Sequence, residues 1–193
     1  MSADSVLLPI PLPLGAFTLD AATPEDVPAL LAAFADPAIA LWNAGRRRDA
    51  PPEERAKVWV ESRATWTREH CSWVVRDAGG TLAGQVSLHL IDEMMGTAEM
   101  GYWLVPGARG RGIGTAAVDT ASRFAFDLLG LARLDLFHAV ENEASCRLAQ
   151  RCGYLLEGTA RQSYVYGDGI RHDEHLHGRL ATDDVAPAAL PAG

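Results

Sequence analysis

A strand-like segment of this chain runs into a turn of glycine and arginine, and the turn runs into a helix-like segment. The turn reads Arg109-Gly110-Arg111-Gly112-Ile113-Gly114 and follows the apolar stretch 98–105. Glycine lets a backbone approach a ligand closely, and the first N–H groups of a helix have no partner inside the helix. Those groups and the positive end of the helix dipole favour phosphate. The segment therefore predicts an anion-binding turn, with two arginines suited to more than one phosphate group.

The segments around this turn alternate between strand-like and helix-like patterns. Period-two alternation and turn signals predict strands near 17–19, 72–76, 82–91, 98–105, 133–140, 154–166 and 172–180. Helical spacing of apolar residues predicts helices over 24–34, 53–69, 112–129 and 142–152, while 36–52 is expected to be irregular. A meander of strands, followed by strands that cross over helices, is typical of an α/β fold with a mixed sheet and helices on both faces.

The length of 193 residues predicts a single domain. We expect this domain to occupy 16–181, after an extended N-terminal arm at 1–15 that is rich in proline. A flexible Ala/Pro tail is expected at 182–193, because this segment has little to bury.

Composition excludes several classes of protein. Acidic residues outnumber Lys and Arg by 25 to 17, a net charge of -8, which argues against a nucleic-acid partner. A run of about 18 apolar residues, as a membrane span requires, is absent from the sequence. The lone lysine, Lys57, follows Ala56, so a phosphate loop of the GxxxxGK[ST] type is impossible. Three cysteines without a CxxC pair predict a cytoplasmic protein rather than a disulfide scaffold.

The glycine turn has one alternative interpretation. Residues 112–117 also satisfy the dinucleotide-binding pattern GxGxxA. That fold expects an acidic residue at the end of the next strand, about 20 residues further on. Asp135 has nearly this spacing but lies inside its predicted strand, and the strand before the turn belongs to a meander. Dinucleotide binding is therefore the weaker hypothesis.

A second motif, at 142–154, resembles a known protein family. Asn142-Glu143-Ala144-Ser145-Cys146-Arg147-Leu148, followed by Gly153-Tyr154, resembles the N-x-x-S-x-x-L…G-[FY] helix of the GNAT N-acetyltransferase superfamily. The turn at 109–114 is similar to that family's [QR]xxGx[GA] motif. Gly101-Tyr102-Trp103-Leu104 and the segment 168–173 resemble the branch of ribosomal-protein N-terminal (Rim-type) acetyltransferases. The resemblance implies the GNAT fold, a mixed and mostly antiparallel sheet that is splayed between the strands at 98–105 and 133–140.

The resemblance also implies acetyl-CoA as co-substrate. The backbone of Leu104 and Val105 would pair with its pantetheine arm, and the amides of the turn would hold its pyrophosphate. Asn142 resembles an asparagine that contacts pantetheine, although its role could also be limited to capping a helix. The expected acetyl-CoA-binding residues are Leu104, Val105, Arg109, Gly110, Arg111, Gly112, Ile113, Gly114, Thr115 and Asn142.

Two residues match the catalytic positions of the family. Glu99 lies where many relatives carry a glutamate base, often acting through water, although it could also be a solvated strand carboxylate. Ser145 lies where the Rim-type branch has a serine that serves the leaving thiolate. Other branches place a tyrosine four residues further on, but here that residue is Ala149. The resemblance implies that the region of Trp42 and Asn43 borders the cleft for the acceptor amine, although Trp42 could equally pack in the core. The arginine run 46–48 in the same region is expected to be a solvated loop.

No metal site is predicted. His172, His175 and His177 lie in one strand, but strand alternation puts only His175 and His177 on a common face. Cys146 is interpreted as a small packing residue rather than a nucleophile.

The sequence therefore predicts an acetyl-CoA-dependent N-acetyltransferase that transfers directly to a primary amine in a ternary complex. A protein or peptide N-terminus is the favoured acceptor, because Asp92, Glu93 and Glu99 should create a negative field near the cleft. A small-molecule amine remains an alternative acceptor, and a non-catalytic domain that senses acyl-CoA remains an alternative function. We expect no nucleic-acid, membrane or metal partner, and either a monomer or a homodimer.

Overall fold

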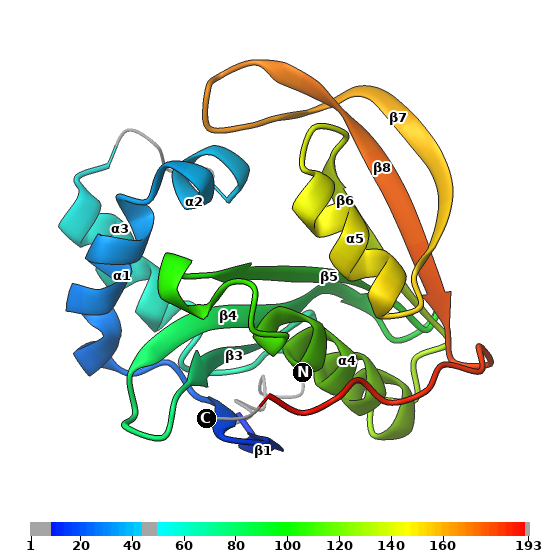
Figure 1. The fold of residues 1–193 in the computed structure, drawn as a ribbon, viewed down its shortest axis with the longest axis horizontal. Helices are drawn as coiled ribbons and strands as arrows, with labels where there is room; N and C mark the ends of the chain where they lie inside the picture. The colour runs from blue at the N-terminus through cyan, green and yellow to red at the C-terminus, as the bar shows by residue number, and fades with distance from the viewer. Residues whose placement is uncertain (1–8, 44–49, 192–193) are drawn as a thin grey trace, which may run out of the picture.

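The computed structural model describes residues 9–43 and 50–191. Within these ranges eight strands form one sheet in the order β1-β2-β3-β4-β5-β6-β8-β7 (Figure 1). Adjacent strands are antiparallel, except that β5 and β6 are parallel. The strands are β1 (Leu12–Leu14), β2 (Phe17–Asp20), β3 (His70–Arg76), β4 (Leu82–Asp92), β5 (Thr97–Leu104), β6 (Arg133–Ala139), β7 (Leu155–Val165) and β8 (Arg171–Leu180). The predicted mixed, mostly antiparallel sheet is confirmed.

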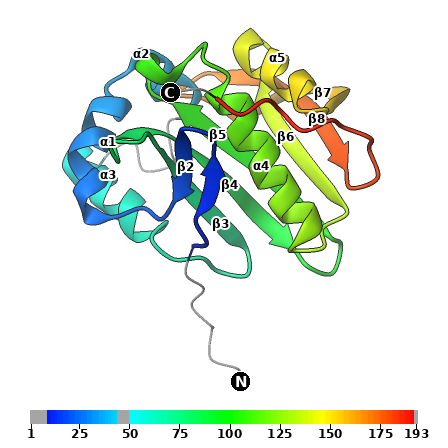
Figure 2. The same cartoon turned by 60° about the horizontal axis from the view of Figure 1, so that its bottom comes forward.

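Helices cover both faces of the sheet, as the sequence predicted (Figure 2). The short helix η1 (Pro24–Asp26) and helices α1 (Val27–Phe34), α2 (Pro37–Trp42) and α3 (Pro52–Glu61) belong to one face. The turn helix η2 (Pro106–Ala108) precedes α4 (Ile113–Asp127), which packs on the other face beside α5 (Glu143–Arg151). None of the helices in the described ranges is long and apolar enough to cross a membrane.

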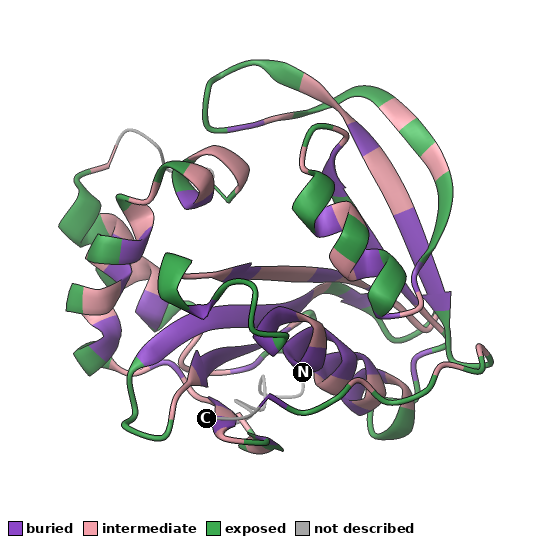
Figure 3. Cartoon of the chain, in the orientation of Figure 1, coloured by how far each residue is buried: buried purple, intermediate pink, exposed green. Residues whose placement is uncertain are grey.

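Each face of the sheet carries its own apolar core. Helix α4 buries Ala117, Ala121 and Phe124 at helical spacing, and the Phe124 ring meets Trp66 and Trp73 edge-on at centroid distances of 5.4 and 5.1 Å. On the opposite face, α1 and α3 pack over strand residues such as Val74 and Trp103. Figure 3 shows the sheet-facing side of α4 and the centre of β4 as buried. The two layers hold β4 and β5 from both sides.

Strands β5 and β6 run together for only a short distance. Their pairing joins Thr97, Ala98 and Glu99 to Arg133, Leu134 and Asp135. Beyond Glu99 the two strands diverge (Figure 1). The predicted splay between these strands is therefore present, and it begins after Glu99.

Several segments differ from the sequence prediction. Residues 12–14 of the predicted extended arm form the edge strand β1, where Pro13 is tolerated because an edge strand needs fewer ladder hydrogen bonds. The segment 36–52, expected to be irregular, contains α2, which Asp36 caps by accepting a hydrogen bond from the Ile39 N–H at 3.0 Å. Helix α3 ends at Glu61 instead of near Glu69.

The predicted C-terminal tail makes specific contacts along α4. Arg123 donates to the Val185 carbonyl at 2.9 Å, and the Ala188 N–H donates to the Asp119 carboxylate at 2.9 Å. Further on, the Pro191 carbonyl accepts from the Ala16 N–H at 3.2 Å. Residues 182–191 therefore lie against the domain through their backbone polar groups. A sequence prediction that considers only apolar burial misses such contacts.

Candidate active site

Two cavities meet where β5 and β6 diverge. The first, of about 540 Å³, is bordered by β5, the glycine turn, the start of α4, and α5. The second, of about 790 Å³, lies on the side of α1 and α3. Both are lined by residues at the splay and at the end of α2: Trp42, Asn43, Met100, Gly101, Tyr102, Trp103, Phe137 and Tyr166. The sheet is thus open from one face to the other at this point, and two ligands, one in each cavity, could contact each other there.

The glycine turn is shaped for a close backbone approach. Gly110 and Gly112 have φ values of 74° and 78°, in the left-handed region that glycine adopts without strain. A Cβ placed on either residue would meet nothing within 4 Å, so both face open space beside the first cavity. Gly112 is also the N-cap of α4, whose first N–H groups therefore point toward the turn. This geometry suits the pyrophosphate site that the sequence predicted.

The two arginine side chains of the turn have protein partners. The Nε of Arg109 donates to the Leu104 carbonyl at 3.0 Å, and its guanidinium pairs with Asp36 at 2.6 Å. That hydrogen bond, together with the Ile39 amide, lowers the pKa of the Asp36 carboxyl. The Arg111 guanidinium lies over the Phe17 ring, 5.5 Å from its centroid. Arg109 therefore links the turn to Asp36 at the start of α2.

The edge of β5 that faces the splay carries backbone groups with no strand beside them. Val105 donates its N–H to the Ala83 carbonyl of the β4 side at 3.0 Å. Because backbone groups alternate along a strand, the N–H and C=O of Leu104, Tyr102 and Met100 point the other way, toward the gap. The Leu104 N–H therefore faces the gap, while the Leu104 carbonyl accepts from the Arg109 Nε. The Val105 N–H is engaged in the sheet, and the contact of Leu104 and Val105 with pantetheine stays a prediction.

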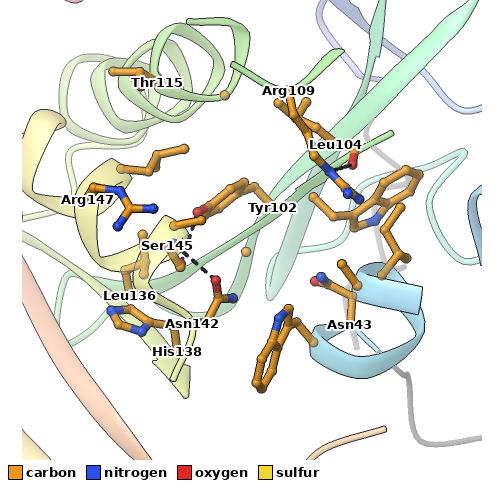
Figure 4. A pocket seen from close by; sticks show the side chains of 18 of the residues that line it. Asn43, Tyr102, Leu104, Arg109, Thr115, Leu136, His138, Asn142, Ser145 and Arg147 are labelled. Carbon is orange, nitrogen blue, oxygen red and sulfur yellow. Dashed lines mark hydrogen bonds between the residues drawn. The ribbon is translucent and has the colours of Figure 1, made fainter. Parts of the chain in front are cut away.

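Asn142 and Ser145 lie together at the start of α5, in the first cavity. The side-chain oxygen of Asn142 accepts from the Ser145 N–H at 3.2 Å, so Asn142 does cap the helix (Figure 4). Ser145 is buried, with 6% of the residue exposed. Its hydroxyl accepts a hydrogen bond from the Tyr102 hydroxyl at 3.0 Å. Burial raises the pKa of Tyr102 to about 12, so the phenol keeps its proton near neutral pH.

Tyr102 is a functional candidate that the sequence analysis used only as part of a motif. Its side chain extends from β5 toward α5 because residues 100, 102 and 104 share one face of the strand. Its partner Ser145 is 43 positions away in the chain, so their contact depends on packing that a local pattern does not report.

Glu99 lines the second cavity, on the opposite face of β5 from Tyr102. Its carboxylate lies 3.3 Å from the Nε2 of His89, its direct cross-strand neighbour on β4. Both side chains are partly exposed, at 39% for His89 and 34% for Glu99. The predicted base and the predicted acid therefore lie on opposite sides of the splay. His89 joins the site through the register of β4 and β5, which the sequence did not indicate.

Among the described residues that line the second cavity, three have a buried polar atom without a partner. The Nε2 of His70, the Nε2 of Gln85 and the Nε of Arg63 have no hydrogen-bond partner within the described ranges. Burial, aided by the charges of Arg63 and His89, lowers the pKa of His70 to about 4, so this ring is neutral at pH 7. An unsatisfied buried polar atom costs about 1–3 kcal/mol. A polar ligand or bound water that reaches these atoms would remove that cost.

The predicted cleft residues Trp42 and Asn43 line both cavities. Trp42 packs edge-on against the Tyr166 ring, with centroids 5.4 Å apart, and Tyr166 donates to the buried Glu174 at 2.8 Å. The arginine run 46–48 lies outside the described residues. Asp92 and Glu93 do not line the cavity: Asp92 accepts from the amides of its own turn, and Glu93 pairs with Arg68 at 3.3 Å. The carboxylates lining it are Glu54, Glu99 and Glu174.

Comparisons with known proteins agree with this geometry. Residues 17–155 match the sequence profile of the acetyltransferase (GNAT) domain. YdaF of Bacillus subtilis (strain 168), provisionally named a ribosomal N-acetyltransferase, is 38% identical over 112 residues, which are 56% of this chain and 61% of YdaF. The spermidine N(1)-acetyltransferase of Vibrio cholerae serotype O1 is 33% identical over 86 residues, 45% of this chain and 50% of that protein. The chain thus spans about half to three fifths of the length of these curated relatives.

A solved structure shows the same fold. RimL, a ribosomal-protein α-N-acetyltransferase in complex with coenzyme A, superposes with a TM-score of 0.73 at 22% identity, covering 89% of this chain and 98% of RimL. The chain belongs to the GNAT acetyltransferase family. The family resemblance inferred from the two sequence motifs is confirmed, and the relatives include ribosomal-protein acetyltransferases, the branch expected from the sequence.

Proposed function

We propose that this protein transfers an acetyl group from acetyl-CoA directly to a primary amine, with the acetyl donor in the first cavity and the amine in the second. The observation that carries this proposal is the opening in the sheet after Glu99, where both cavities share their lining. Direct transfer requires two ligands that meet, and one continuous opening between two cavities provides for it.

On the donor side, the chain offers the groups that an extended thioester ligand needs. The amides of the turn and the start of α4 would hold the pyrophosphate, as helix N-termini commonly do. The gap-facing N–H of Leu104 and the gap-facing N–H and C=O of Tyr102 would pair with the pantetheine amides, while the Leu104 carbonyl is held by Arg109. A β5 N–H that points into the gap would polarise the thioester carbonyl, where negative charge develops during attack. Asn142 keeps its side-chain nitrogen for pantetheine while its oxygen caps α5.

On the acceptor side, Glu99 would accept the proton that an ammonium must lose before it attacks. The adjacent His89 is placed to hold the carboxylate in position and to share that proton. A proton taken at Glu99 stays on the acceptor face of β5, away from the leaving thiolate.

On the leaving-group side, Ser145 would donate its hydroxyl proton toward the thiolate of coenzyme A. Tyr102 donates to the Ser145 oxygen, which leaves the serine hydrogen directed elsewhere and makes it a better donor. The high pKa of Tyr102 keeps this relay intact over the working pH range. Acid and base functions are thus separated by the thickness of one strand.

For the acceptor we propose a peptide or protein N-terminus. The second cavity is lined by three carboxylates, Glu54, Glu99 and Glu174, and by two arginines, Arg55 and Arg63. This mixed lining attracts an ammonium and also offers partners to a peptide backbone. A peptide N-terminus has no carboxylate beside its amine, whereas a free amino acid would bring one close to Glu99. The 38% identity to YdaF supports this choice.

A polyamine is the second candidate. The three carboxylates of the cavity and the 33% identity to a spermidine N(1)-acetyltransferase favour it. Two cationic nitrogens on one flexible chain could meet two of these carboxylates at once, but Arg55 and Arg63 would oppose a multiply charged ligand.

The test compares kcat/KM for a short amidated peptide, the matching free amino acid and spermidine, at low and high salt. We expect the peptide to be the best substrate, with a modest decrease at high salt because screening weakens the attraction of its ammonium. A free amino acid that outperforms the peptide without salt dependence would overturn the acceptor assignment. If acetyl-CoA binds but none of the amines releases free coenzyme A, the chain is a sensor and the proposed function is wrong.

A further inference from the structure

Four metal-binding side chains converge behind the donor cavity. His138 comes from β6, His175 and His177 from β8, and Cys146 from α5. One donor atom from each lies within 4.8 Å of the others. The Nε2 atoms of His138 and His177 are 3.1 Å apart, and the Cys146 sulfur is 3.8 Å from the His177 Nε2. Three separate elements therefore place an N₃S donor set around one point.

The backbone fixes the orientation of two of these rings. The Nδ1 of His138 lies 2.8 Å from the Ala139 carbonyl, and the Nδ1 of His177 lies 3.3 Å from the Tyr154 carbonyl. A carbonyl only accepts, so in each neutral ring the hydrogen is on Nδ1 and the lone pair is on Nε2. Two lone pairs then face each other at 3.1 Å with no proton between them. A cation between the two nitrogens would turn this repulsion into coordination.

We propose that His138, Cys146, His175 and His177 bind one zinc ion in a tetrahedral site. With Zn–N near 2.05 Å and Zn–S near 2.3 Å, a tetrahedron has edges of about 3.4 Å between nitrogens and about 3.6 Å between nitrogen and sulfur. Two of the six separations, 3.1 and 3.8 Å, are already close to these values. All six are within 4.8 Å, so the widest must contract when the ion binds. Imidazole and thiolate donors without a carboxylate favour zinc over magnesium or calcium.

The surroundings of the cluster also fit a metal site. The side-chain amide of Gln150 donates toward the Cys146 sulfur at 3.7 Å, which stabilises a thiolate. The Ala139 and Tyr154 carbonyls, which lie beside the Nδ1 atoms of His138 and His177, act as the outer partners that orient metal-bound histidines. The Nδ1 of His175 is buried and has no partner within the described ranges, so this ring is not committed to another hydrogen bond through that atom.

The proposed role of the ion is structural. Four protein ligands complete a tetrahedron and leave no open coordination position, as in structural zinc sites. His138 and His177 are buried, and Cys146 and His175 are half-buried. Such an ion would tie β6, β8 and α5 together behind Asn142 and Ser145, which start the same helix as Cys146. The sequence predicted no metal because only His175 and His177 share a face of one strand. The other two donors reach them from β6 and α5.

Cobalt(II) titration of the full chain, purified and stripped of metal with a chelator, tests the site. We expect one equivalent of cobalt to give the intense visible absorption of four-coordinate cobalt and a near-ultraviolet thiolate-to-cobalt charge-transfer band. One equivalent of zinc should bleach both. Competition with a chromophoric chelator then gives the zinc affinity. None of these readouts involves acetyl transfer, so the result is independent of the proposed function.

Matched variants locate the ion. Cys146→Ser should abolish the charge-transfer band, and Cys146→Ser and His175→Ala should each weaken zinc binding by more than the about 10- to 100-fold typical of losing an outer partner. Cys71→Ala removes a buried cysteine outside the cluster, and His172→Gln changes a histidine of the same strand that pairs with Asp168 instead. Both controls should leave the spectrum unchanged.

Two results would overturn the proposal. One is a wild-type chain that shows no four-coordinate cobalt spectrum with cobalt in excess. The other is a spectrum that persists in Cys146→Ser, which would place the ion elsewhere. The wild-type titration is decisive by itself if a ligand variant fails to fold.

Discussion

The hydrogen bond from Tyr102 to Ser145 makes a prediction that separates catalysis from folding. Replacing Tyr102 with phenylalanine removes one hydroxyl and keeps the ring that packs in the core. The lost bond is a neutral one of 3.0 Å in a partly buried setting, worth about 0.5–1.5 kcal/mol. If that energy supports Ser145 during departure of the thiolate, kcat should fall about 2- to 12-fold. The KM for acetyl-CoA should change little, because the β5 backbone and the turn remain.

A double-mutant cycle gives the sharper form of this test. Ser145→Ala should lower kcat by about 10²-fold or more, as expected for the loss of a general acid. Since Tyr102 acts through Ser145, adding Tyr102→Phe to Ser145→Ala should have no further effect on kcat. The assay is release of free coenzyme A at saturating acetyl-CoA and peptide. If the double variant instead loses the product of the two single effects on kcat, Tyr102 acts independently of Ser145, and the proposed relay is wrong.

The chain contains a matched control. Tyr154 is fully buried, and its hydroxyl lies 2.7 Å from the Ser122 hydroxyl in the core under α4. Tyr154→Phe removes the same kind of bond from a place that neither cavity touches. It should lower the melting temperature by a few degrees, at about 2–4 °C per kcal/mol for a chain of this length, and leave kcat unchanged. A comparable fall in kcat would show that the Tyr102 effect reflects stability alone.

Other substitutions test the remaining parts of the site and the fold. Glu99→Gln should depress turnover most at low pH, because a base matters most while the amine is protonated; a pH profile of kcat/KM checks this. Gly112→Ala should raise the KM for acetyl-CoA, since a φ of 78° costs a non-glycine residue about 1–2 kcal/mol, whereas Gly107→Ala, with open space and no positive φ, should not. Asp119→Ala breaks a buried pair with Arg179 at 2.8 Å and should cost about 3–5 kcal/mol in chemical denaturation. Burial alone would raise the pKa of Asp119, but hydrogen bonds from Ala188, Arg179 and Arg123 outweigh it and lower that pKa. The stabilisation by this pair is therefore present above the ordinary aspartate pKa and is lost as the pH falls through the lowered pKa.

The parts of this structure that the sequence predicted are those encoded locally. The turn at 109–114 needs positive φ at Gly110 and Gly112, and only glycine adopts that conformation easily, so the residue pattern itself reports the geometry. The cap at Asn142 and the start of α5 follow from the same kind of local rule. The order of the longer strands and helices could be predicted because each carries its own period of apolar residues, whereas the short elements β1 and α2 were missed.

Contacts between elements could not be predicted in this way. The sequence predicts that Arg109 binds phosphate, yet its partner in the structure is Asp36, which lies 73 positions earlier and caps the start of α2. The pairing of Val105 with Ala83 depends on the register of β4 and β5, and a pattern on β5 alone does not contain it. The pair His89 and Glu99 depends on the same register.

The central claim is that acetyl passes directly from acetyl-CoA to the amine through the opening between β5 and β6. Initial rates measured over a grid of acetyl-CoA and amidated-peptide concentrations test it, with intact-protein mass spectrometry after incubation with acetyl-CoA alone. Direct transfer predicts intersecting double-reciprocal lines, as a ternary complex requires, and a protein mass without an added acetyl group. Parallel lines together with an acetylated enzyme, for example at Cys146, would show a covalent intermediate and would contradict it.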